Sequence, residues 1–117
     1  MVILTEPAFW VLTALAEAPR HGYAVLRRVE ELSGGESPLR VTTLYATLER
    51  LERDGRVRVV SEEVVDGRAR RTYDVTDLGR EVLSVEVDRL VVRARAGQAS
   101  LGGRQPAGGT AAGWAPA

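Results

Sequence analysis

The 117-residue sequence contains no cysteine and a single histidine, His21. The missing cysteines exclude disulfides, zinc-thiolate sites and thiol nucleophiles, and one imidazole cannot form a histidine cluster around a metal. No nucleophile has an adjacent base, and Gly34-Gly35 lacks the lysine and the spacing of a phosphate-binding P-loop. We therefore expect no catalytic residues, no metal and no cofactor, which makes an enzyme the least supported class of function.

Long apolar runs and an excess of one charge are also missing. No segment approaches the about 20 apolar residues that cross a bilayer, and the N-terminus lacks the basic and apolar stretches of a signal peptide. These absences predict a cytoplasmic protein without membrane contact. All 16 basic residues are arginines, and 16 acidic residues balance them. The field of the whole chain therefore does not favour nucleic acid, and DNA binding would depend on local placement of charge.

Aromatic residues are few, at 5% of the chain, whereas 44% of the residues are hydrophobic. This length and composition predict one domain with a small aliphatic core, and such cores often gain stability by dimerising. From Gly97 to Ala117 the sequence is mostly Gly, Ala and Pro with scattered polar residues, a composition that buries too little surface to order itself. We therefore interpret residues 97–117 as a flexible tail, which contains Trp114.

Two helices are predicted in the first third of the chain. Thr5 is expected to cap the first, which runs to about Ala18. Its buried face is formed by Ala8, Val11, Leu12 and Leu15, whereas Trp10 and Ala14 are expected on the opposite side. The second helix spans Tyr23 to Leu32 and ends at Ser33 and the two glycines that follow.

A third helix begins near Thr42, its expected cap, after an extended segment around Pro38. Its buried edge consists of Leu44, Leu48 and Leu51, and Gly55 takes the C′ position that favours a left-handed residue. The outward face carries Thr43, Tyr45, Ala46, Glu49, Arg50 and Arg53.

The hydrophobic period changes to two after this helix, which predicts a β-hairpin with its turn at Asp66-Gly67. A fourth helix then opens at Thr76 and reaches about Ala96. It carries two apolar stripes, one of Leu83, Val87, Leu90 and Ala94, the other of Leu78, Val82, Val85 and Val92. Because one domain covers only one stripe, we expect the second to contact a partner subunit.

This order of elements predicts a mainly α-helical protein with a small β-hairpin, the winged helix-turn-helix architecture. Residues 1–75 would form the winged-helix DNA-binding domain and residues 76–96 a dimerisation helix. The helix that starts near Thr42 would enter the major groove, with its free amides and the hydroxyls of Thr42 and Thr43 facing phosphates. Arg68, Arg70 and Arg71 surround the tip of the wing at Gly67, where they would neutralise phosphates or enter the minor groove.

The chain resembles the PadR family of bacterial transcriptional regulators over roughly residues 4 to 90. The resemblance lies in His21-Gly22-Tyr23, in Thr43-Leu44-Tyr45 followed by Leu48, Leu51 and Asp54-Gly55, and in Gly67-Arg68 through Arg71-Thr72-Tyr73 to Thr76 and Gly79. It implies a dimeric repressor that binds an inverted-repeat operator and releases it when a small molecule binds. It also implies groove contacts from Thr43, Tyr45 and Ala46 and a wing tip of Gly67, Arg68 and Arg70.

Several residues allow two interpretations. Tyr45 contacts DNA or packs against a helix edge, and His21 caps a helix more readily than it binds a ligand. Tyr23 is expected to anchor its helix in the core, with a contact from its hydroxyl to a DNA phosphate as the alternative. Trp10, with Ala14 beside it, either packs under a partner's fourth helix or lines a cavity for an aromatic or hydrophobic effector, and the two roles are compatible.

The sequence therefore favours a DNA-binding transcriptional regulator that acts as a homodimer on double-stranded DNA near its own operon. The expected DNA contacts are Thr42, Thr43, Tyr45, Ala46, Arg50, Gly67, Arg68 and Arg70. The expected dimer or effector residues are Trp10, Ala14, Leu78, Val82, Val85 and Val92. The alternative is a winged-helix module that binds protein and not DNA, which the near-neutral charge would suit.

Overall fold

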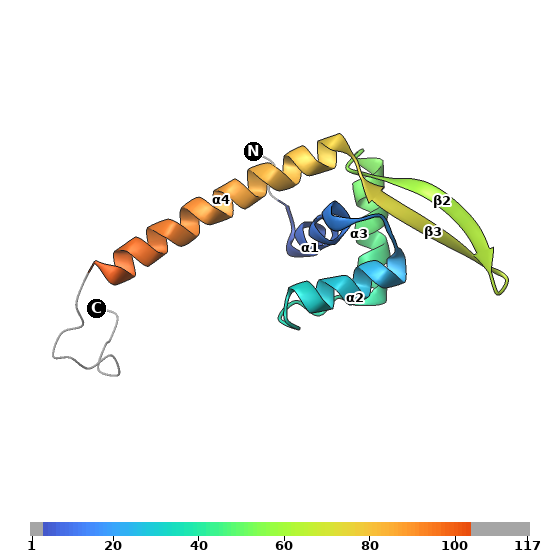
Figure 1. Ribbon diagram of the computed structural model, residues 1–117, viewed down its shortest axis with the longest axis horizontal. Helices are drawn as coiled ribbons and strands as arrows, with labels where there is room; N and C mark the ends of the chain where they lie inside the picture. Colours follow the sequence, from blue (N-terminus) through green and yellow to red (C-terminus); the bar gives the residue numbers. More distant parts are fainter. Residues whose placement is uncertain (1–3, 104–117) are drawn as a thin grey trace. The chain divides into compact units, whose positions relative to one another are not determined.

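The computed structural model describes residues 4–103, which form four α-helices and three β-strands (Figure 1). In chain order these are α1 (Glu6–Glu17), β1 (Arg20–His21), α2 (Gly22–Leu32), α3 (Val41–Arg53), β2 (Val57–Val65), β3 (Arg68–Val75) and α4 (Asp77–Gly102). The expected class, mainly helical with a small hairpin, is confirmed. The chain divides into two units, one ending at Glu86 and the other beginning at Val87, so that α4 contributes to both. Within residues 4–103 no helix is long and apolar enough to cross a membrane.

Helix α1 lies at the centre of the first unit, where it packs against α2, α3 and β3. As expected, Thr5 caps it, accepting a hydrogen bond from the Ala8 amide at 3.3 Å. Val11, Leu12 and Leu15 are fully buried. The expectation that Ala14 lies on an outer face is wrong, because Ala14 is also fully buried. A helix covered by several elements buries more than one face, which the single-face pattern did not anticipate.

Helix α3 begins one residue earlier than expected, at Val41. The N-cap is Arg40, whose side chain makes no capping hydrogen bond, so Thr42 is not the cap and lies exposed in the first turn. Leu44, Leu48 and Leu51 are buried, as predicted. The helix ends in a Schellman motif, in which the Arg56 amide donates to the Leu51 carbonyl at 2.8 Å and Gly55 has a φ of 75°.

The hairpin of β2 and β3 is joined by the short strand β1, giving the antiparallel order β1-β3-β2. Asp66 and Gly67 both have positive φ, 52° and 77°, as the predicted two-residue turn requires. A register shift between Val59 and Ser61 leaves Val60 as an extra residue in β2. Strand β1 was not predicted because two residues are too short to give a period-two pattern.

Helix α4 extends to Gly102, six residues beyond the predicted end at Ala96. Gly97 was taken as the terminator, but one glycine in a helix costs only about 1 kcal/mol relative to alanine, and its neighbours Ala96 and Gln98 both favour a helix. The start of the predicted tail is therefore helical. The rest of the tail from residue 104 onward, with Trp114, lies outside the described residues.

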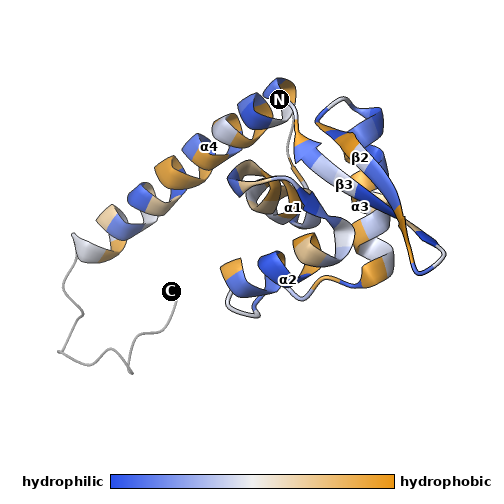
Figure 2. Ribbon diagram, turned by 45° about the vertical axis from the view of Figure 1, so that its right-hand side comes forward, coloured by the Kyte–Doolittle hydropathy of each residue, from blue (hydrophilic) through white to orange (hydrophobic). Residues whose placement is uncertain are grey.

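The two apolar stripes predicted on α4 do not separate into one facing the domain and one facing away. Val82 and Leu83, one from each stripe, both pack half-buried against the core of the first unit. Val82 therefore also contacts its own domain, which the stripe pattern did not anticipate, and its contact with a partner subunit stays a prediction. Leu78, Val85 and Val92 remain 47%, 57% and 67% exposed, and apolar and polar residues alternate along the helix (Figure 2).

Candidate nucleic-acid interface

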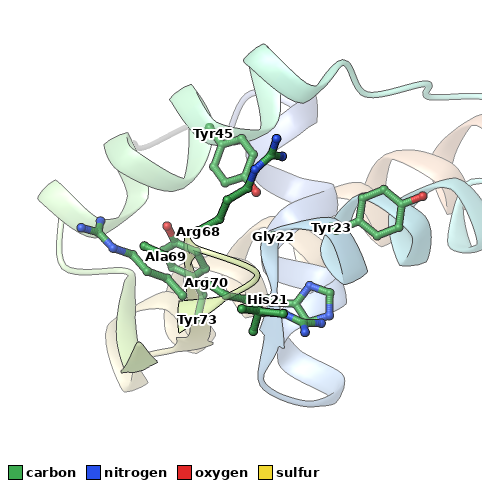
Figure 3. Close-up of a pocket in the computed structure, with 10 residues that line it drawn as sticks. His21, Gly22, Tyr23, Tyr45, Arg68, Ala69, Arg70 and Tyr73 are labelled. Carbon is green, nitrogen blue, oxygen red and sulfur yellow. The ribbon is translucent and has the colours of Figure 1, made fainter. Parts of the chain in front are cut away.

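A groove of about 520 Å³ lies between the start of α2, the outward side of α3 and the wing strand β3. Tyr45 reaches it from α3, and Arg68 and Arg70 reach it from β3 (Figure 3). The other lining residues are His21, Gly22, Tyr23, Val65, Ala69, Arg71 and Tyr73. The structure therefore brings three of the predicted DNA-binding residues, Tyr45, Arg68 and Arg70, to one concave surface. With these three included, that surface is lined by three arginines and three tyrosines.

Gly22 and Tyr45 meet at the floor of this groove. A β-carbon at position 22 would lie 2.6 Å from the Tyr45 hydroxyl oxygen and 2.9 Å from two of its ring carbons. Only glycine leaves room for the phenol there, although the Tyr45 side chain itself is 48% exposed. The first residue of α2 thus leaves the space that the α3 tyrosine occupies, and sequence reasoning did not identify Gly22 as a site residue.

His21 caps α2, as favoured from the sequence, since its Nδ1 accepts a hydrogen bond from the Ala24 amide at 3.3 Å. The same residue pairs with Thr72 in the sheet, so it joins the helix, the sheet and the groove. Partial burial and the nearby Arg70 guanidinium lower the pKa of His21, and the Glu63 carboxylate offsets part of that effect. The lowered pKa favours the neutral imidazole, which is the form whose Nδ1 accepts the capping hydrogen bond.

Tyr23 does not anchor α2 in the core, contrary to expectation, because its side chain is 61% exposed. The buried face of α2 consists of Gly22, Val25 and Val29, and Tyr23 lies about 100° round the helix from Gly22. Its side chain instead lines the groove.

The wing pairs acidic residues of β2 with basic residues of β3. Glu62 lies opposite Arg71 and Glu63 opposite Arg70, and the Arg71 Nε is 3.7 Å from a Glu62 carboxylate oxygen. Directly opposed residues share a face of the hairpin, so each face carries one such pair. The nearby Glu62 raises the pKa of Arg71. Arg68 differs, because the residue opposite it is Val65.

Tyr73 of β3 connects the wing to the core of the domain. Its side chain is 6% exposed and belongs to the core, and burial raises the pKa of its phenol. The Arg71 guanidinium interacts with the same phenol and partly opposes that rise. The guanidinium of Arg71 therefore interacts with both the Glu62 carboxylate and the Tyr73 phenol within the domain.

The remaining α3 candidates lie on the other flank of the helix. Thr42, Thr43, Ala46 and Arg50 line a second groove of about 710 Å³ between α3 and the N-terminal end of α1, which also includes Thr47, Asp54 and Arg56. Gly67 lies at the tip of the wing, with no atom near enough to contact an added β-carbon. Apart from Gly67, the predicted DNA-binding residues thus divide between two grooves, one on each flank of α3.

Two glycine positions at the base of the wing complete the local geometry. Thr76 donates a hydrogen bond from its hydroxyl to the Gly55 carbonyl at 2.6 Å and accepts one from the Gly79 amide at 3.1 Å. A β-carbon at position 79 would overlap the carbonyl oxygen of Arg56. Gly79 therefore permits α4 to start against the end of α3 and the start of β2, which fixes where the wing leaves the domain.

Comparison with known proteins relates this architecture to one family. Residues 11–85 match the transcriptional regulator PadR-like family. A transcriptional regulator of Mycobacterium tuberculosis is 44% identical over 79 residues, which is 68% of this chain and 60% of that protein. The chain thus matches less than two thirds of the length of this relative.

Solved structures show the same fold at low sequence identity. A PadR family regulator from Clostridium difficile superimposes with a TM-score of 0.70 at 19% identity, covering 83% of this chain and 99% of that one. The Bacillus subtilis PadR in complex with operator DNA gives a TM-score of 0.61 at 18% identity, covering 68% of this chain and 46% of that chain.

Proposed function

The chain belongs to the transcriptional regulator PadR-like family, and on this premise we propose that it is a DNA-binding transcriptional regulator. It acts in the cytoplasm as a dimeric repressor of a nearby operon and releases its operator when a small molecule binds. The observation that carries the proposal is the groove in which Tyr45 of α3 lies beside Arg68 and Arg70 of the wing. A helix that reads a major groove and a wing that neutralises the adjacent backbone need this arrangement.

In this proposal the outward face of α3, which carries Tyr45, Ala46 and Arg50, enters the major groove. Thr42, Ala46 and Arg50 contact bases or phosphates on one flank, and Tyr45 contacts the backbone on the other. The first amides of α3 receive no side-chain cap, which leaves donors for a phosphate. Gly67 allows the wing tip to approach the DNA closely, and Arg68 and Arg70 neutralise phosphates there.

The balanced charge of the chain favours binding as a dimer, because one domain brings few uncompensated arginines. The exposed Leu78, Val85 and Val92 on α4 support a contact with a second copy, since apolar side chains at this density are unusual on a free helix. Two α3 helices about one DNA turn apart would then read an inverted repeat. Trp10 of α1, which lines a small hollow, supports a role in binding an effector.

The test is binding to the DNA upstream of the gene that encodes the chain, followed by fluorescence anisotropy over a range of salt concentrations. We expect affinity to fall steeply with salt, with a slope of about 0.9 for each phosphate contacted. A scrambled duplex of equal length serves as the control. If the chain binds neither duplex and instead retains a protein partner with little dependence on salt, it is an interaction module and the proposal is wrong.

A further inference from the structure

A separate hollow of about 240 Å³ lies between the start of α1 and the loop that leads into α3. Its apolar walls are formed by Pro7 and Trp10 of α1, Val29 of α2 and Pro38 and Leu39 of the loop. Sites for drug-sized ligands usually run from about 300 to 1,000 Å³, so this hollow suits a molecule with a single ring.

Charged groups at this hollow are all acidic, in contrast to the arginine-lined groove beside the wing. Glu6 and Glu36 line it and no basic residue does. One carboxylate oxygen of Glu6 accepts hydrogen bonds from the Ser37 hydroxyl at 2.5 Å and from the Trp10 indole at 3.5 Å. Those bonds orient the carboxylate and the indole at the same side of the hollow.

The indole itself is held in place by its neighbours. Trp10 makes an edge-to-face contact with Phe9, with ring centroids 5.3 Å apart, and its side chain is half-buried against the core. A fixed indole face attracts cations through its negative surface. Carboxylates beside an aromatic ring are the groups that recognise an organic ammonium ion.

We propose that this hollow binds a small organic cation, an aromatic or alkyl ammonium compound whose apolar part packs against Trp10, Pro38 and Leu39. The ammonium group lies between the carboxylates of Glu6 and Glu36. The charge of these two residues selects cations over neutral or anionic compounds of the same shape.

The site is connected directly to the candidate DNA-reading helix. Leu39 is followed by Arg40, the N-cap of α3, whose side chain makes no capping hydrogen bond to the first turn of the helix. The loop begins at Gly34 and Gly35, which have positive φ, and an added β-carbon at either position would meet no atom within 4 Å. A cation packed against Pro38 and Leu39 therefore changes the position of the first turn of α3. This consequence, though not the binding itself, rests on the proposed DNA-binding function.

The binding is tested by fluorescence in a Trp114→Phe variant, which leaves Trp10 as the sole tryptophan. The probe is benzyltrimethylammonium, with benzoate and benzyl alcohol as anionic and neutral comparisons. We expect the cation to change Trp10 emission with a dissociation constant of about 1 mM or tighter, and each comparison compound to bind at least about fivefold more weakly. Glu36→Gln should weaken cation binding about threefold. Glu30→Gln, an exposed change on α2 outside the hollow, should leave it unaltered.

Three results would overturn the proposal. The first is an unchanged Trp10 emission together with unchanged amide NMR signals for Ser37 and Leu39. The second is equal binding of all three compounds, which would exclude recognition by charge. The third is a probe response that depends on protein concentration, because it would place Trp10 in a contact between two copies. A chain that binds the cation but no DNA leaves this site standing and refutes only the proposed function.

Discussion

The phenol of Tyr45 lies against the α-carbon of Gly22, so that a β-carbon there would come within 2.6 Å of the hydroxyl oxygen. This contact joins the first turn of α2 to the outward side of α3. It also explains why two short motifs, His21-Gly22-Tyr23 and Thr43-Leu44-Tyr45, occur in one chain, since the glycine of the first makes space for the tyrosine of the second.

We predict that Gly22→Ala displaces Tyr45 without unfolding the domain. The atoms that the new β-carbon would overlap belong to the Tyr45 side chain, which is exposed and can move. Alanine also favours a helix over glycine by about 1 kcal/mol. The net change in unfolding free energy should therefore stay below about 1 kcal/mol. DNA affinity should fall by about fivefold or more because the tyrosine loses its position. In a Tyr45→Ala background the same Gly22 substitution should not alter DNA affinity further. Equal effects in both backgrounds would show that the contact plays no part.

A second prediction distinguishes the wing arginines. Arg68 lies opposite Val65, whereas Arg71 is engaged by Glu62 and Tyr73. Arg68→Ala should therefore weaken DNA binding by about 1 kcal/mol and lower the salt slope by about 0.9. Arg71→Ala should do so by less, and the Arg68→Ala and Arg70→Ala double variant should lose the most. Arg27→Ala, an exposed change on α2, is the control. Wild-type affinity in the double variant would exclude the wing from DNA binding.

The acidic strand of the wing should restrain DNA binding. Glu63 lies opposite Arg70 and Glu62 opposite Arg71, so each carboxylate competes with phosphate for an arginine. Glu62→Gln and Glu63→Gln should each raise affinity about twofold to fivefold at low salt, for specific and scrambled duplexes alike. Glu30→Gln removes the same charge from α2 and should change little. An unchanged affinity in both wing variants would mean that the pairs do not compete with DNA.

Much of this fold follows from local sequence signals. Thr5, Gly55 and Asp66-Gly67 act as the cap, the helix end and the turn that their residue types predict, because such signals depend on a few neighbouring backbone atoms. Burial on α3 follows its helical spacing for the same reason.

The features that sequence reasoning missed depend on distant partners. Ala14 is buried because α2, α3 and β3 surround α1, and β1 forms only because β3 pairs with it. The groove unites Gly22, Tyr45 and Arg68 from three elements, and no spacing within one element predicts their approach. The separation of Thr42 and Ala46 from Tyr45 is likewise a property of what packs beside each flank of α3.

Dimerisation through α4 is testable by placing a charge on its exposed apolar side chains. Val92 is 67% exposed, so Val92→Glu should leave the monomer folded. In a dimer that buries this position, an unpaired carboxylate should raise the dissociation constant about tenfold or more. Sedimentation velocity over a concentration series measures this, with Ser84→Glu, an exposed polar position, as the control. Dimers of undiminished affinity in the Val92 variant would place the interface elsewhere.

The neutral His21 should make the stability of the domain depend on pH. Burial and Arg70 lower its pKa in the folded state, whereas in the unfolded chain the pKa is about 6.5. The unfolded state therefore binds the proton more readily, so the contribution of His21 to stability is complete above about pH 6.5 and is lost as the pH falls through the folded pKa. Protonation also removes the Nδ1 acceptor of the Ala24 amide.

His21→Asn is the informative variant, because asparagine caps a helix equally well but does not titrate. Chemical denaturation between about pH 7.5 and 5.5 spans the histidine range and lies above the pKa of ordinary carboxyl groups. We expect the wild-type chain to lose unfolding free energy over this interval and the His21→Asn variant to lose less. Parallel losses in the two proteins would show that another group titrates. A wild-type stability that rises on acidification would mean that the folded domain stabilises the imidazolium, the opposite of what burial beside Arg70 dictates.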